Sequence, residues 1–157
     1  MTPTEYELLV QKLVDELASA FSDMAGNVIG SGARNRISGL SGYKHQIDVS
    51  MTAGEWLILV ECKRWNTKIG VEEVLVLASR VADINPTVPG RQIWVSMVSC
   101  KGATRGAQAL ARHFHLNVDT VESPHEYAVR LRNHVAVGQR DNLGLGDSCK
   151  VEVIRAE

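Results

Sequence analysis

The sequence predicts an α/β fold in which a mixed β-sheet is flanked by helices. Two apolar runs separated by a short turn are typical of a strand hairpin, and further apolar runs follow later in the chain. Segments with apolar residues at three- and four-residue steps alternate with these runs and predict helices. The resulting order is helix, strands, helix, strand, helix, strand, helix, which is the pattern of such a sheet.

The composition suits one globular domain, because the 157 residues are 45% hydrophobic and 22% charged. We expect a domain over residues 1–134, with residues 135–157 as a C-terminal extension that adds an edge strand or contacts a partner. No apolar run reaches membrane-spanning length, and the N-terminus lacks a signal-peptide pattern. The lack of a membrane-spanning run also argues against a membrane partner. The three cysteines lack metal-ligand spacing, which favours reduced thiols in the cytoplasm.

The first element is expected to be an amphipathic helix over residues 4–24. Its apolar residues recur at helical spacing and are Tyr6, Leu9, Leu13, Leu17, Phe21 and Met24. Thr4 and Glu7 have the spacing of a capping box at its start.

A short strand at residues 27–30 and a glycine-rich segment at residues 30–44 come next. The second segment also carries Arg34, Arg36 and Lys44. Glycine-rich backbone predicts a mobile loop, which could close over a phosphate backbone. A plain connector is the alternative.

Two strand-like runs, at residues 45–51 and 56–63, lie on either side of a turn at residues 52–55. In the first run apolar and polar residues alternate, which places Asp48 on the polar face of the strand. The second run is almost uniformly apolar, as is typical of a central strand covered on both faces.

Charged residues end this second strand. Glu61 and Lys63 share a face, while Cys62 points the other way. Charges at the end of an apolar strand are costly unless they are paired or bound to metal. Asp48 and Glu61 could hold a divalent cation, and Lys63 could orient a water or stabilise charge on a phosphate. A salt bridge between Lys63 and one acid explains the spacing equally well.

The hairpin resembles the PD-(D/E)xK nucleases and, within them, the Mrr-like restriction endonucleases. The resemblance covers roughly residues 5–120 and rests on Gly42-Tyr43, Ile47-Asp48-Val49, Val60-Glu61-Cys62-Lys63-Arg64-Trp65, Ile69-Gly70-Val71 and Gly102…Gly106-Ala107. Ile47 stands where the name of the superfamily has proline, a departure that is common in this branch.

The resemblance implies the restriction-endonuclease-like fold and a DNA endonuclease that requires Mg²⁺, with Mn²⁺ as a substitute. It implies that Asp48, Glu61 and the main-chain carbonyl of Cys62 hold the metal. Lys63 would position or activate the attacking water.

Two further residues are candidates for this site. Related enzymes place an acid early in the first helix in the metal site, and Glu7 matches that position. Helix capping is the alternative role for Glu7. Gln46, two residues before Asp48 in the same run, is a candidate for orienting the nucleophile.

The charge distribution is uneven, although the formal net charge is only −1. One lysine and five acids give residues 1–29 a charge of −4, whereas residues 30–68 and residues 91–134 each carry +3. A phosphate backbone would favour this arrangement, so we expect DNA as a partner. Ordinary solvated surface is the alternative for any single residue. The candidate DNA contacts are Lys44, Arg64, Lys68, Lys101 and Arg105.

The remaining elements follow from periodicity and capping signals. They are a helix at 71–84 stopped by Asn85-Pro86, a strand at 92–98, a helix that ends near 115, a strand at 116–121 and a helix starting at Ser123-Pro124. Glycines with Lys101 and Arg105 at the start of the second of these helices are suited to a phosphate contact.

Three functions are compatible with this pattern. The first is a restriction or defence endonuclease, the second a structure-selective nuclease similar to Holliday-junction resolvases, and the third a non-catalytic DNA-binding or assembly subunit. A complete acid–acid–lysine set argues against the third. Cutting both strands of a duplex calls for two sites, so we expect a homodimer. Mrr-like nucleases usually carry a separate DNA-reading domain, so specificity here is expected to come from a partner such as a separate subunit, from a dimer or from DNA shape.

Overall fold

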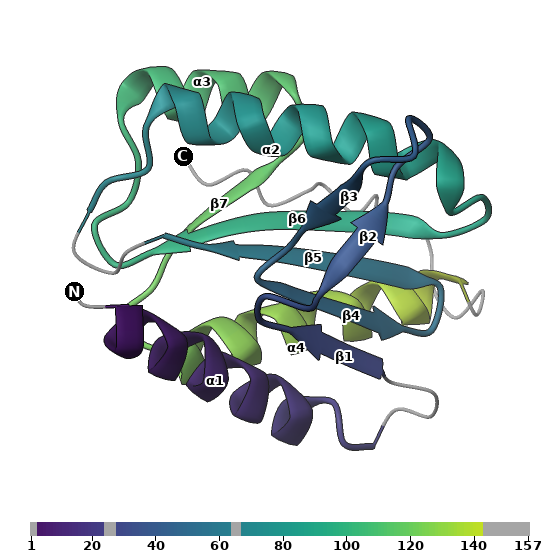
Figure 1. The fold of residues 1–157 in the computed structure, drawn as a ribbon. Coiled ribbons are helices and arrows are strands. Elements are labelled where there is room, and N and C mark those ends of the chain that lie inside the picture. The colour runs from purple at the N-terminus through teal and green to yellow at the C-terminus, as the bar shows by residue number, and fades with distance from the viewer. Residues whose placement is uncertain (1–2, 24–27, 64–66, 143–157) are drawn as a thin grey trace.

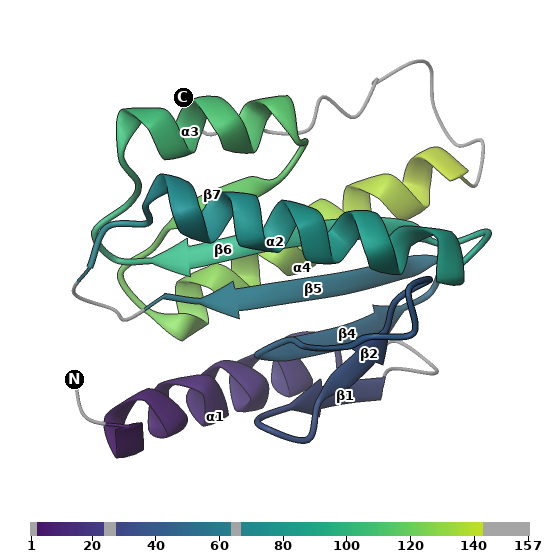
Figure 2. The same ribbon diagram turned by 45° about the horizontal axis from the view of Figure 1, so that its top comes forward.

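The computed structural model describes residues 3–23, 28–63 and 67–142 of the chain. The elements are α1 (Pro3–Ala20), β1 (Val28–Ser31), β2 (Arg36–Ser38), β3 (Lys44–Gln46), β4 (Val49–Ala53), β5 (Trp56–Cys62), α2 (Val71–Ile84), a 3₁₀ turn (Asn85–Thr87), β6 (Gln92–Ser99), α3 (Arg105–His113), β7 (Asn117–Thr120) and α4 (Pro124–Asn142). A five-stranded sheet lies between α1 and α4 on one face and α2 and α3 on the other (Figures 1 and 2). The predicted fold class, a mixed sheet flanked by helices, is confirmed.

The sheet has the strand order β1-β4-β5-β6-β7 and is centred on β5. β4 runs antiparallel to β1 and β5, whereas β5, β6 and β7 run parallel to one another. Successive side chains of β5 enter opposite halves of the core. Ile58 and Val60 pack on the α1 and α4 side, while Leu57 and Leu59 pack on the α2 and α3 side. This double coverage explains why the strand is apolar throughout its middle.

The helices follow their predicted apolar faces. In α1 and the turn after it, Leu13, Leu17 and Phe21 recur every four residues and are buried. α2 has the predicted bounds and buries Val74 and Leu77 against the sheet. The predicted strands and helix in the second half are also present, as β6, α3 and β7.

One predicted strand is wrong. Residues 45–51 do not form a single strand, because Ile47 and Asp48 separate β3 from β4. Ile47 packs in the half of the core on the α2 and α3 side, whereas Val49 packs in the opposite half. A continuous strand would place both side chains on the same face, so the chain turns between them. Asn35 holds the turn with two hydrogen bonds. Its side-chain Nδ2 donates to the Ile47 carbonyl at 2.8 Å, and its main-chain carbonyl accepts from the Ile47 N–H at 3.1 Å.

The segment 30–44 is not the plain mobile loop that its glycines predict. It contains β2, which pairs with β3 in a two-stranded ribbon beside the C-terminal end of α2 (Figure 1). Asp83 of α2 ties this ribbon down. Its carboxylate accepts from the N–H and hydroxyl of Ser41 at 2.8 and 2.6 Å, and it contacts His45 Nε2 at 2.7 Å. Hydrogen bonds from Ser41 and His45 lower the pKa of Asp83 to about 2.

The C-terminal helix crosses the boundary that we placed at residue 134. α4 begins as predicted, with Pro124 in its first turn and the Ser123 hydroxyl accepting the Glu126 N–H at 3.2 Å. It continues without a break to Asn142. Residues 143–157, including the predicted edge strand, lie outside the described residues. Among the residues that the structure describes, no helix is both long and apolar enough to cross a membrane.

Replacing Asp83 with alanine should release the β2–β3 ribbon while the sheet remains intact. Amide exchange at Ser41 should become roughly tenfold faster, because its N–H donates to the carboxylate that is lost. The wild type should behave similarly in acid. Because the pKa of Asp83 is depressed, its contribution is complete above about pH 4 and is lost as the pH falls towards about 2.

Hydrogen exchange followed by mass spectrometry or NMR measures both effects. Asp15→Ala, which removes an exposed carboxylate from α1, serves as the control. Unchanged exchange at Ser41 in Asp83→Ala would show that the ribbon is anchored by other contacts.

Candidate active site

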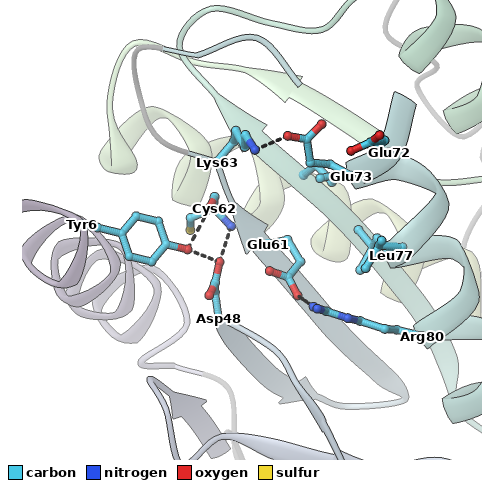
Figure 3. Close-up of a pocket in the computed structure, with 11 residues that line it drawn as sticks. Tyr6, Asp48, Glu61, Cys62, Lys63, Glu72, Glu73, Leu77 and Arg80 are labelled. Atoms are coloured by element: carbon cyan, nitrogen blue, oxygen red, sulfur yellow. Dashed lines mark hydrogen bonds and ion pairs between the residues drawn. The ribbon is translucent and has the colours of Figure 1, made fainter. Parts of the chain in front are cut away.

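A cavity of about 350 Å³ opens at the C-terminal end of β5, between α1 and α2 (Figure 3). The hairpin contributes Asp48, Glu61, Cys62 and Lys63 to its lining. The helices contribute further side chains, which are Tyr6 from α1 and Glu72, Glu73, Val76, Leu77 and Arg80 from α2. The structure therefore brings together the acid–acid–lysine set that was predicted from the hairpin.

Asp48 is positioned by the turn that separates β3 from β4. Its Oδ2 accepts the main-chain N–H of Cys62 at 2.8 Å and also the hydroxyl of Tyr6 (Figure 3). The Tyr6 hydroxyl lies 2.9 Å from the Cys62 carbonyl oxygen as well. Burial, and then the charge of Asp48, raises the pKa of Tyr6 far above its usual value, so this hydroxyl remains a donor.

Glu61 lies next to Asp48, on the face of β5 that points toward α2. The pKa of Glu61 is raised to about 8, mainly by burial and next by the charge of the neighbouring Asp48. Arg80 opposes this rise, because its Nη1 donates to Glu61 Oε1 at 2.7 Å. Ionising both carboxylates in this partly desolvated site is therefore costly, and a cation between them would offset that cost.

These groups fit a hard divalent cation. Two carboxylates and the Cys62 carbonyl supply oxygen ligands of the kind that Mg²⁺ and Mn²⁺ accept. Among the described residues, no three Asp, Glu, His or Cys side chains form a metal-binding group. A site here would consequently depend on the main-chain carbonyl of Cys62 in addition to the side chains of Asp48 and Glu61.

Lys63 forms its ion pair with Glu73 of α2, rather than with either acid of the hairpin (Figure 3). The other Glu73 oxygen accepts the Gly70 N–H at 2.7 Å, so the carboxylate is held at the start of α2. The hydrogen bond from Lys63 lowers the pKa of Glu73. The simple salt bridge considered from the sequence, between Lys63 and Asp48 or Glu61, is therefore not the arrangement in the structure.

Two candidates from the sequence lie outside the cavity lining. Glu7 is exposed, because neighbouring helix residues point about 100° apart and Tyr6 takes the inward direction. α1 begins at Pro3, one residue before the predicted cap Thr4. Gln46 is exposed on β3 and offers Arg80 only its main-chain carbonyl, at 3.1 Å. Because the chain turns after β3, the side chains of Gln46 and Asp48 do not share a face as they would on one continuous strand.

The predicted DNA contacts divide into two groups. Lys68, Lys101 and Arg105 are exposed at the edge of the sheet where β5 and β6 end. Hydrogen bonds between the two loops hold this edge together, from Ile69 N–H to the Gly102 carbonyl at 2.8 Å and from Thr104 N–H to the Ile69 carbonyl at 3.0 Å. The same edge carries Lys63. Lys44 is exposed on the separate β2–β3 ribbon, and Arg64 lies outside the described residues.

The sequence analysis missed Tyr6, Glu73 and Arg80 as members of the site. Tyr6 was assigned to the apolar face of the first helix, and its hydroxyl gave no separate signal. Glu73 follows Gly70 at capping-box spacing, which identifies a helix start but not a partner for Lys63. Arg80 lies one turn before the end of α2 and reaches the site only because α2 packs across β5.

No family model and no curated protein matches this sequence. Among solved structures, AF1548, a protein of unknown function, matches with a TM-score of 0.53 and 15% identity over 88% of this chain and 79% of its own. Can2 from Sulfobacillus thermosulfidooxidans, solved in complex with cyclic tetra-adenylate, matches with a TM-score of 0.52 and 18% identity over 82% of this chain and 34% of its own. These likenesses show a shared fold.

A repair endonuclease from Pyrococcus abyssi matches less closely. Its TM-score is 0.43 with 22% identity, over 57% of this chain and 38% of the endonuclease. That score is too low to support an argument about this chain. This chain also spans only about a third of Can2, so activity is not transferred from the matched structures. Membership of the Mrr-like family remains a prediction.

Glu61→Gln should raise the stability of the protein in chelator. The change removes one member of a repelling, partly buried carboxylate pair and leaves an oxygen that accepts from Arg80. We expect a gain of about 1–2 kcal/mol, or a few degrees in Tm. Thermal unfolding measured by circular dichroism in EDTA tests this.

Glu72→Gln is the matched control, because Glu72 is exposed on the rim of the same cavity. It should change stability by less than about 0.5 kcal/mol. A loss of stability in Glu61→Gln would mean that the ion pair with Arg80 outweighs the repulsion from Asp48.

Proposed function

We propose that this protein is a metal-dependent deoxyribonuclease that hydrolyses phosphodiester bonds in DNA. The observation that carries the proposal is the convergence of Asp48, Glu61 and Lys63 in one open cavity. Two adjacent carboxylates and an ammonium group at the end of a central strand are costly for stability. Such a set is useful to an enzyme and has no evident use in a subunit that only binds DNA.

The ligands for the metal would be Asp48, Glu61 and the Cys62 carbonyl. Mg²⁺, or Mn²⁺ in its place, would supply Lewis acidity towards a phosphate oxygen and a water of lowered pKa. Asp48 is held for this task by the Cys62 N–H, which fixes one of its oxygens. Arg80 holds Glu61 from the opposite side and limits the movement of its carboxylate.

Lys63 would act on the attacking water and on charge that develops at the phosphate. Its ion pair with Glu73 orients the ammonium group at the edge of the cavity. An ammonium group has three donors, so pairing with Glu73 leaves others for the substrate. This arrangement favours charge stabilisation over removal of a proton as the role of Lys63.

The DNA backbone would lie along the edge that carries Lys68, Lys101 and Arg105. Lys68 and Lys101 lie in the loops beyond β5 and β6, and Arg105 begins α3, at the same edge of the sheet as Lys63. Phosphate contacts at this edge would position a strand over the cavity without selecting a sequence. We further propose that the enzyme acts in restriction or defence and that two copies pair to cut both strands. A separate subunit would supply the specificity.

Asp48→Ala and Glu61→Ala should each reduce cleavage of supercoiled plasmid at least ~100-fold, because each removes a metal ligand. Cleavage by the wild type should require Mg²⁺ or Mn²⁺ and stop in EDTA. The measurement is a time course on agarose gels, with circular dichroism to confirm folding. Glu72→Ala should remain active as the control. Full cleavage in EDTA, or by Asp48→Ala, would exclude this mechanism.

Lys63→Ala should bind DNA within about twofold of the wild type yet lose at least ~100-fold in turnover, since its role is in the transition state. Fluorescence anisotropy in EDTA gives the affinity, and single-turnover cleavage gives the rate. If affinity and turnover fell by the same factor, Lys63 would be a phosphate contact only.

Neutralising Lys68, Lys101 or Arg105 should weaken binding equally for unrelated DNA sequences. Each change should reduce the slope of log affinity against log salt by roughly one, as the loss of a phosphate contact does. Lys12→Ala, an exposed lysine on acidic α1, is the control and should leave the slope unchanged. A loss confined to one DNA sequence would indicate base recognition instead.

A further inference from the structure

The Tyr6 hydroxyl contacts both Asp48 and the Cys62 carbonyl, which are two of the three groups assigned to the metal. It donates to Asp48 Oδ2 and lies 2.9 Å from the carbonyl oxygen (Figure 3). A phenol has one proton, so it cannot satisfy both oxygens fully at the same time. Three oxygens therefore meet around a single hydrogen, at the place where we propose that a cation binds.

We propose that Tyr6 is a displaceable occupant of the metal site. In the metal-free protein its hydroxyl lies against the Asp48 carboxylate and the Cys62 carbonyl, and it withdraws from them when a cation binds. A lone pair that accepts a hydrogen bond is not available to a cation from the same direction. The inference rests on the proposed function, because it requires that Asp48 and Cys62 bind a metal.

The position of Tyr6 in the fold allows this movement. Tyr6 belongs to the first turn of α1 and is only partly buried. The buried residues of the helix, Val10, Leu13 and Leu17, lie about one, two and three turns further along. Rotation of the Tyr6 side chain, or fraying of the first turn, would withdraw the hydroxyl together with the packing of the Tyr6 ring, while Val10, Leu13 and Leu17 keep α1 packed on the sheet.

The neighbouring contacts support an occupant rather than a fixed strut. Asp48 Oδ2 already accepts the Cys62 N–H at 2.8 Å, so the carboxylate remains positioned after the hydroxyl leaves. Glu61 has its own partner in Arg80 and does not depend on Tyr6. Loss of the hydroxyl therefore frees ligand oxygens and leaves the rest of the site in place.

Tyr6→Phe tests the proposal, because it removes only the hydroxyl. Titration calorimetry of metal-free protein with Mn²⁺ should show binding that is about fivefold tighter than in the wild type, the order of one hydrogen bond. Thermal unfolding should show a lower Tm without metal, since two oxygens lose their donor, and an unchanged Tm with saturating Mn²⁺. The stabilisation by Mn²⁺ is then larger in the variant.

Tyr43→Phe is the matched control and should alter neither quantity, because Tyr43 is exposed on the segment before β3. Unchanged or weaker Mn²⁺ binding by Tyr6→Phe would overturn the inference, and weaker binding would make Tyr6 a ligand. An equal loss of Tm with and without metal would also overturn it. If the wild type did not bind Mn²⁺, the proposed metal site itself would be wrong. Asp48→Ala, which lacks a proposed ligand, gives the reference titration for absent binding.

Discussion

The repulsion between Asp48 and Glu61 is the constraint around which the site is built. Two carboxylates share a partly buried cavity, and each needs a compensating group to remain there. Asp48 receives the Cys62 N–H and the Tyr6 hydroxyl, whereas Glu61 receives Arg80. Lys63 is kept from collapsing onto either acid because Glu73 pairs with it. Glu61 and Lys63 thus have separate ionic partners and Asp48 has two neutral donors, which keeps the three proposed reactive groups distinct.

The rest of the fold holds this arrangement in place. β5 buries Leu57, Ile58, Leu59 and Val60, and burial of each such side chain contributes roughly 1.5–3 kcal/mol. This packing offsets the cost of charges at the end of the strand. It also fixes the directions from which partners arrive, since α1 covers one face of β5 and α2 the other. A displaceable Tyr6 fits this plan, because the movable contact comes from a helix end and the fixed contacts come from the middle of the sheet.

Most of the secondary structure could be predicted because it depends on local periodicity. The bounds of α2 and the apolar character of β5 follow from side-chain spacing and from the stop at Asn85-Pro86. A single strand was wrongly predicted at residues 45–51, because apolar and polar residues continue to alternate through Ile47 although the chain turns there. That turn arises from the packing of Ile47 on the far side of the sheet and from Asn35, neither of which is a local signal. The two-stranded ribbon at residues 36–46 was not predicted for the same reason, since the Asp83 side chain that anchors it at Ser41 is 42 residues away.

The sequence by itself predicted which residues supply the proposed reactive groups. Asp48, Glu61 and Lys63 are placed by strand alternation and by the end of an apolar run, which are properties of neighbouring residues. Only the tertiary structure decided which partners control them. Tyr6 is 42 residues from Asp48, Arg80 is 19 from Glu61, and Glu73 is 10 from Lys63. Many side chains in the chain could donate or accept at such separations, and the packing of α1 and α2 across β5 selects among them.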